Sequence, residues 1–269
     1  MKSNKYLSKR EIQLAEYEIL KYLDAVCKKN NITYYLFAGT ALGAARHKGF
    51  IPWDDDIDIL MPRKEYDKLR GLKIQDERFE FVFPEEQDTP DYLFAKLFDK
   101  TIKLEAENGI DSNYLWIDIF QLDSLGNDPI AAHDKNAKLV KKFARVRRAI
   151  AGTNEGKTKV ERIKFSIMNK LYSIYSQKRL AQKAINQYQK YNDLDSEYFC
   201  STWSTNRGDI LKKEWLKETI DIKFEDGRFK IFSGYKEYLP NRYGKNYMEL
   251  PPKSMQVTHS FKAWKVNEK

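Results

Sequence analysis

Aspartates crowded into one short stretch carry most of the chemistry that this chain could perform. They are Asp54, Asp55, Asp56 and Asp58. The run continues as Ile57-Asp58-Ile59, which alternates like a half-buried strand, so Asp56 and Asp58 are expected to point to the same side. Carboxylates held side by side repel each other unless a cation or a proton is shared. Because such oxygen ligands suit Mg²⁺ bound jointly with phosphates, we expect a metal site here rather than a solvated acidic turn.

A third acid, Asp118, lies inside the apolar run 115–121, which predicts a buried strand. An ionised carboxylate there needs a partner, and a metal ion shared with Asp56 and Asp58 would be one. Asp118 could instead accept the proton of an attacking hydroxyl. The alternative is a surface aspartate on an edge strand.

The pair Gly39-Thr40 is expected to form a phosphate-binding turn between a strand at 32–38 and a short helix at 41–47. Gly39 has no side chain, so a phosphate could approach the backbone closely, and Thr40 adds a hydroxyl. The first N–H groups of the following helix could also face an anion. A Gly-Thr turn, an Asp-x-Asp strand and a later strand with one Asp are the parts of a nucleotidyltransferase-type site.

Two cations are candidates for phosphate contacts. Arg46 could reach a diphosphate, and Lys96 could neutralise a phosphate, although a solvated arginine and a lysine that extends its ammonium to solvent are the alternatives. Asp54 and Asp55 are expected to support the ligands or to form the turn. His259 could line the site, but a single histidine is more often structural.

Composition narrows the class of protein. The chain has 269 residues, 42% hydrophobic content and a net charge of +9, so it can build a core and favours an anionic partner. Cys27 and Cys200 have no redox or metal spacing, which indicates a reduced compartment. No signal-like start and no long apolar run is present, so we expect a cytoplasmic protein, with peripheral contact at the inner face of the membrane left open.

The expected fold class is α+β: a mixed sheet with flanking helices, a basic helical region and a C-terminal β-hairpin. We divide the chain into a catalytic core at 1–130, a basic helical region at 131–200 and a segment at 201–269 that completes the core. Ser8 and Glu11 predict a capped helix to about Lys28. Further strands are expected at 55–61, 79–83, 93–98 and 102–106, a helix opening at Pro62, a helix at 180–191, and a hairpin at 220–225 and 228–232.

The excess positive charge lies between Lys138 and Lys183, where fourteen Lys or Arg face two acids. These basic helices could lie against an anionic membrane or a lipid-linked diphosphate. They could also follow a phosphate-rich acceptor chain, or simply present a cationic outer face.

Three separate stretches closely resemble the LicD family: 37–58 with its Ile-Pro-Trp before the acids, Ile-Asp-Ile-Phe at 117–120, and Arg-Tyr-Gly with Leu-Pro-Pro at 242–252. This resemblance implies a nucleotidyltransferase-like fold and transfer of phosphocholine from CDP-choline to a sugar hydroxyl of a bacterial glycan, releasing CMP. The acceptor it implies is a lipid-linked teichoic acid precursor or another cell-surface glycan such as lipopolysaccharide. By the same resemblance Asp56, Asp58 and Asp118 match the acids that bind one or two Mg²⁺ ions.

Other functions stay open at this point. A CDP-alditol phosphotransferase or a nucleotidyltransferase would use the same site, and a membrane-associated adaptor would not need all three acids. A nucleic-acid binder is disfavoured, because no zinc-finger or RNP-like motif accompanies the basic charge. Choline would need aromatic rings or a carboxylate around its ammonium group, and Trp53, Trp116 and Trp203 are candidates beside ordinary core packing.

Overall fold

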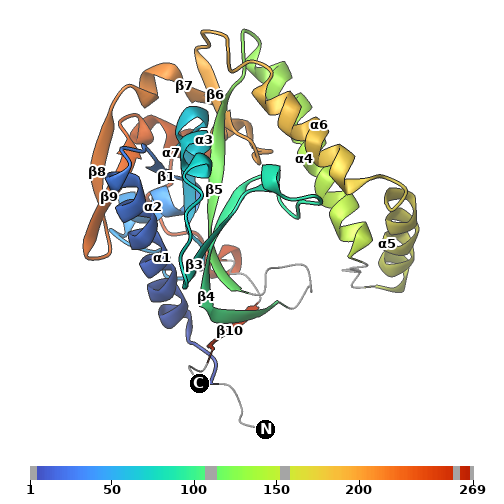
Figure 1. Cartoon of the computed structure of the whole chain (residues 1–269), viewed down its shortest axis with the longest axis horizontal. Coiled ribbons are helices and arrows are strands. Elements are labelled where there is room, and N and C mark those ends of the chain that lie inside the picture. Colours follow the sequence, from blue (N-terminus) through green and yellow to red (C-terminus); the bar gives the residue numbers. More distant parts are fainter. Residues whose placement is uncertain (1–4, 107–113, 152–157, 257–260, 267–269) are drawn as a thin grey trace.

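A mixed sheet forms the centre of the computed structural model, which describes residues 5–106, 114–151, 158–256 and 261–266 (Figure 1). Its main path runs β1-β2-β5-β4-β10, with β3 also beside β4, β6 also beside β5, and β7 beyond β6. Only β2 and β5 are parallel among these pairs. The strands are β1 (Tyr35–Leu36), β2 (Asp58–Pro62), β3 (Phe79–Val82), β4 (Ala95–Ala106), β5 (Tyr114–Ser124), β6 (Tyr198–Ser201), β7 (Leu211–Lys212) and β10 (Phe261–Lys265).

Helices flank this sheet, so the predicted α+β class is confirmed. They are α1 (Lys9–Lys29), α2 (Ala38–Arg46), α3 (Arg63–Gly71), α4 (Pro129–Ile150), α5 (Lys159–Tyr172), α6 (Gln177–Gln189) and α7 (Tyr235–Tyr243). Short 3₁₀ turns are η1 (Pro84–Glu86), η2 (Arg207–Asp209), η3 (Lys213–Leu216) and η4 (Lys253–Met255). In Figure 1, α1, α2 and α7 lie to the left of β5, while α4, α5 and α6 extend to the right as a helical arm.

Short sequence motifs predicted several elements correctly. The Ser8 hydroxyl and the Glu11 carboxylate form the expected capping box at the start of α1. The hairpin is also confirmed: β8 (Thr219–Phe224) and β9 (Gly227–Phe232) form a separate two-stranded sheet. In contrast, β6, β7, α7 and β10 were not predicted. The three strands are short and gain their stability from pairing with distant segments, and α7 contains Pro240, which disfavours a helix prediction.

Element limits near the acids differ from the prediction. Strand β1 has only two residues, and α2 begins at Ala38, so Gly39 and Thr40 lie in the first helical turn and not in a turn before it. Strand β2 begins at Asp58, so Asp56 precedes the strand, and the expected alternation of the two side chains does not apply. The strands expected at 93–98 and 102–106 are one strand, β4, with an irregular register between Asp99 and Lys103.

Among the described residues, three apolar clusters hold the chain together, and two of them are large. The larger surrounds the sheet and includes the inner face of α1, where Ile19, Leu20 and Leu23 are fully buried. The second joins α4 to α6 through residues such as Phe143 and Tyr188. Helix α5 contributes no buried residue to either cluster. In the part of the chain that the structure describes, no helix is both long and apolar enough to span a bilayer.

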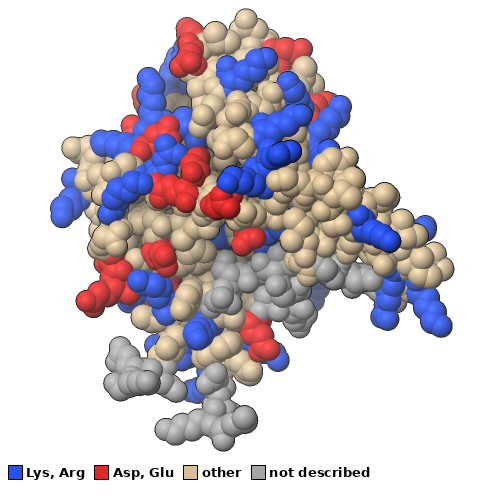
Figure 2. Space-filling model, turned by 45° about the vertical axis from the view of Figure 1, so that its right-hand side comes forward, with Lys and Arg blue, Asp and Glu red and all other residues tan. Residues whose placement is uncertain are grey.

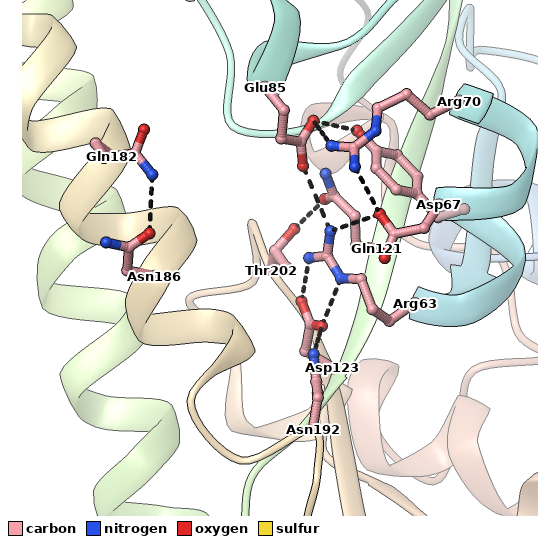
Figure 3. A network of polar contacts seen from close by, with 11 residues as sticks. Arg63, Asp67, Arg70, Glu85, Gln121, Asp123, Gln182, Asn186, Asn192 and Thr202 are labelled. Atoms are coloured by element: carbon pink, nitrogen blue, oxygen red, sulfur yellow. Dashed lines mark hydrogen bonds and ion pairs between the residues drawn. The ribbon is translucent and has the colours of Figure 1, made fainter.

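A buried polar network fastens α3 to β5 (Figure 3). The Arg63 guanidinium donates to both oxygens of Asp123, at 2.8 and 2.5 Å, and its Nη1 lies 3.4 Å from Oε1 of Glu85 in η1. Asn192, which follows α6, donates to Asp123 Oδ1 at 2.6 Å. Since these groups come from four separate segments, the network fixes how the helical arm meets the sheet.

Candidate active site

Asp58, Asp118 and Lys96 lie level with one another on three adjacent strands. Asp58 of β2 is paired with Asp118 of β5, and Asp118 is paired with Lys96 of β4. The Lys96 ammonium donates to Asp118 Oδ1 at 2.6 Å, with the two side chains 3% and 15% exposed. The parallel pairing of β2 with β5 therefore brings two predicted acids together from positions far apart in the sequence, and gives one of them a cationic partner.

Aromatic rings enclose the same ammonium group. Lys96 Nζ is 4.1 Å from the ring centres of both Tyr92 and Trp116, and 5.3 Å from that of Phe94. Cation–π attraction at these distances stabilises a buried cation. Lys96 was predicted to neutralise a phosphate, and in the structure it is a fixed partner of Asp118.

The acids form a region of strong negative charge. Burial raises the pKa of Asp58 well above its ordinary value, and the nearby carboxylates of Asp56 and Asp118 raise it further. Arg242, at the end of α7, acts in the opposite direction and lowers this pKa. A second cation close to Asp58 would relieve the same repulsion.

The start of α2 positions the acidic segment. The Asp58 N–H donates to Thr40 Oγ1 at 2.8 Å, and the Phe37 N–H donates to the Asp58 carbonyl at 3.0 Å. A Cβ at Gly39 would come within 2.8 Å of Asp54 Oδ2, so this glycine makes room for a carboxylate of the chain itself. Ala38 has a φ of 43°, a left-handed conformation that is uncommon for a residue with a side chain and is often found at functional sites.

A cleft of about 540 Å³ opens beside Asp58, a size typical of small-molecule sites. One end is formed by β2, β5 and the start of α2, through Asp58, Phe120, Phe37 and Ala38. The other walls come from α4, from 201–209 and from α7. They include Lys141, Arg145, Arg148, Trp203, Ser204, Asn206, Asp209 and Arg242.

The sequence did not predict which basic residues line this cleft. The sequence marks the basic stretch between Lys138 and Lys183, but helical periodicity alone does not say which face meets the sheet. In the structure, Lys141, Arg145 and Arg148 of α4 line the cleft. Asp58 is the one predicted acid among the described lining residues, since Asp56 and Asp118 do not line the cleft. The cations of α4 suit a ligand that carries several phosphate oxygens.

Arg242 is held in place by a buried acid. It forms an ion pair with Asp209, which is 2% exposed and also accepts from Tyr238 Oη at 2.9 Å and from Ser204 Oγ at 2.5 Å. Its position in the Arg-Tyr-Gly motif was a usable sequence signal. The ion pair with Asp209 was not foreseeable, because η2 and α7 meet only in the fold.

The other predicted site residues have different surroundings. Arg46 Nη1 donates to the carbonyls of Tyr247 and Glu249 at 2.8 and 3.0 Å, so it anchors the segment after α7. Of the tryptophans considered for choline, Trp203 lines the cleft, Trp116 contacts Lys96 and Trp53 faces the ring of His47. His259 lies outside the described residues.

The donor set fits a hard divalent cation in its chemistry. Carboxylate oxygens are the ligands that Mg²⁺ prefers. Burial is the main cause of the raised pKa of Asp58, and the charges of Asp56 and Asp118, which a cation would balance, raise it further. Within the described ranges, no three His, Cys, Asp or Glu side chains gather closely enough to hold a metal ion by themselves. An ion held here would therefore share its coordination with a substrate, as Mg²⁺ commonly does with phosphates.

Comparison with known proteins gives consistent matches. A family model described as the LicD/FKTN/FKRP nucleotidyltransferase domain matches residues 31–142. The chain is 34% identical over 266 residues to the lipopolysaccharide cholinephosphotransferase LicD of Haemophilus influenzae, covering 95% of this chain and 97% of that protein. It is also 27% identical over 111 residues to the human ribitol 5-phosphate transferase FKRP, which covers 38% of this chain and 22% of the relative.

Proposed function

The chain belongs to the LicD family, and from this premise we propose that it transfers phosphocholine from CDP-choline to a sugar hydroxyl of a cell-surface glycan. Its class is that of a phosphotransferase. One observation carries the proposal: Asp58 stands at one end of a cleft whose other wall carries Lys141, Arg145 and Arg148. The proposal includes a nucleotidyltransferase-like core and the domain limits 1–130, 131–200 and 201–269.

The reaction exchanges one phosphorus–oxygen bond for another. The acceptor hydroxyl oxygen forms a bond to the phosphorus of phosphocholine, the bond from that phosphorus to the bridging oxygen breaks, and CMP leaves with the electron pair. Asp118, held by Lys96, is our candidate to accept the hydroxyl proton. Arg145 and Arg148 are proposed to hold the diphosphate, since positioning and charge neutralisation dominate phosphoryl transfer.

Asp56 and Asp58 are the residues proposed to hold one or two Mg²⁺ ions, with Asp118 beside them. When bound, Mg²⁺ neutralises phosphate oxygens and the charge that develops on the leaving group. Gly39 and Thr40 support this arrangement by placing the start of α2 against the acidic segment.

The acceptor is proposed to be a lipid-linked glycan precursor at the cytoplasmic face of the cell membrane. The relative in Haemophilus influenzae is named for lipopolysaccharide, while a teichoic acid precursor presents the same chemistry of a sugar hydroxyl near a lipid carrier. Trp203 is the best placed of the candidate tryptophans to contact choline, because it lines the cleft.

A second candidate function is transfer of ribitol phosphate from CDP-ribitol. The match to the ribitol 5-phosphate transferase FKRP favours it. Both donors share the cytidine diphosphate group and differ only in the alcohol. The two functions are therefore distinguished by which donor binds, since the same aspartates would serve both.

Thermal stabilisation by CDP-choline, CDP-ribitol, CTP and CMP, each with and without Mg²⁺, tests the proposal. A ligand that binds only the folded state raises the melting temperature by mass action. We expect the largest Mg²⁺-dependent shift with CDP-choline. A larger shift with CDP-ribitol would favour the second function, and a shift with CTP alone would contradict both.

Turnover by an Asp58→Asn variant tests the role of the acids. We expect CMP release to fall at least about a hundredfold, the scale of a single catalytic group, with the melting temperature retained. Asp195→Asn is the matched control, because that side chain is 85% exposed and lies in the segment before β6. A loss under about threefold in Asp58→Asn would remove Asp58 from the catalytic site.

A further inference from the structure

Helix α5 presents an apolar stripe to solvent. All its residues except Asn169 and Tyr172 are exposed, and the largest exposed side chains recur at helical spacing. They are Val160 at 62%, Ile163 at 60%, Ile167 at 57% and Leu171 at 61%, followed after the helix by Ile174 at 78%. Successive steps of three or four residues place these side chains along one narrow face. A face of this kind on a folded protein marks an interaction surface.

Charge borders the stripe. Lys159, Lys164 and Lys170 lie on α5 beside the apolar side chains, and all three are exposed. In Figure 2 the helical arm at the right carries Lys and Arg side chains toward its lower end, and Asp and Glu do not show on the arm in that view. An apolar stripe with lysines along its edges is typical of a helix that lies in the interface of an anionic bilayer.

Helix α5 packs against α4 through a face other than the apolar stripe. Arg145 of α4 donates to Tyr172 Oη at 3.2 Å, and the Lys142 ammonium lies 3.7 Å from the ring centre of Tyr175. The apolar stripe takes no part in the α4–α6 cluster. The second core therefore does not depend on the stripe, which is free to contact another surface.

We propose that α5 docks this protein on an anionic membrane, with its apolar stripe inserted among lipid chains and its lysines against lipid phosphates. A second copy of the chain fits the stripe less well, because pairing two such helices would bring lysine-bordered faces together. One consequence rests on the proposed function. Helix α5 contacts α4, and other residues of α4 line the cleft, so docking would hold the cleft near a lipid-linked acceptor.

Vesicle flotation tests the docking surface without any donor or acceptor. The full chain is mixed with vesicles of phosphatidylcholine and phosphatidylglycerol at 3:1, and with vesicles of phosphatidylcholine alone. We expect binding to the anionic vesicles, weakened at least about tenfold in Ile163→Gln/Ile167→Gln, which keeps the charge and helix propensity but removes two apolar side chains. Leu14→Gln is the control, since Leu14 is a 44% exposed leucine on α1.

Other outcomes would overturn the proposal. Absence of binding to the anionic vesicles, or equal binding by parent and double variant, would remove α5 as a membrane surface. A dimer in sedimentation velocity that disappears in the double variant would assign the stripe to a second copy. CMP release with a soluble sugar acceptor is measured in parallel, because that activity should be unchanged by the double variant and its absence in the parent would count against the proposed function alone.

Discussion

Replacing Asp123 by Asn should destabilise the fold by about 3 kcal/mol, because it leaves the buried Arg63 guanidinium without its main partner. The two side chains are 4% and 10% exposed, and breaking a buried pair on one side costs ~3–5 kcal/mol. We expect the lower end of that range, since Glu85 Oε1 remains 3.4 Å from Arg63 Nη1. At roughly 2–4 °C per kcal/mol for a chain of this size, the melting temperature should fall by about 6–12 °C.

Thermal melts followed by circular dichroism measure this effect, with urea titration at 25 °C as a second readout. Asp134→Asn is the matched control: Asp134 also pairs with an arginine, Arg207, but the two side chains are 40% and 60% exposed. An exposed pair contributes about 0–1 kcal/mol, so the control should lose less than about 4 °C. Equal losses in the two variants would refute the view that burial makes the Arg63 network important.

Two further predictions concern pH and donor binding. Glu16 is 2% exposed, and burial followed by the charges of Asp56 and its neighbours raises its pKa well above the ordinary value. The folded state then holds a proton that the unfolded state has released, so stability falls as the pH rises from about 4.5 toward the raised pKa. Glu16→Gln should have a higher melting temperature than the parent at about pH 8 and the same melting temperature near pH 4. Melting temperatures that differ by the same amount at every pH would contradict this prediction. Arg148→Gln should raise the KM for CDP-choline about tenfold, the scale of one charge-assisted hydrogen bond. Arg179→Gln on α6 is the control and should leave the KM unchanged. Equal KM values for the two variants would exclude Arg148 from the donor site.

Local patterns in the sequence predicted what depends on neighbouring residues. The capping box of Ser8 and Glu11, the turn between β8 and β9, and the apolar run around Asp118 each reflect a few adjacent positions, and the structure contains the corresponding elements. The strand predicted to include Asp56 begins only at Asp58, whose N–H donates to Thr40 Oγ1 at the start of α2.

The sequence alone did not predict which side chains from distant segments contact each other in the site. Lys96 looked like a lone cation among apolar residues, and only the β4–β5 register brings its ammonium to Asp118. The sequence also did not show which cations of α4 line the cleft, because its buried apolar face packs in the arm and the basic residues on its other sides do not reveal which of them point toward the site. The ion pair of Arg242 with Asp209 forms only where α7 packs against η2.

The cleft is lined by residues from inside and outside the segment that the family model matches. Asp58 and the α4 residue Lys141 lie within 31–142, the segment that the family model matches, whereas Trp203, Asn206 and Arg242 come from outside it. Mutation can therefore alter the outer wall while the acids stay unchanged. Exchanging residues 201–242 between relatives would change this wall while Asp58, Arg145 and Arg148 stay in place, and we expect such exchanges to alter the contacts to the alcohol carried by the donor.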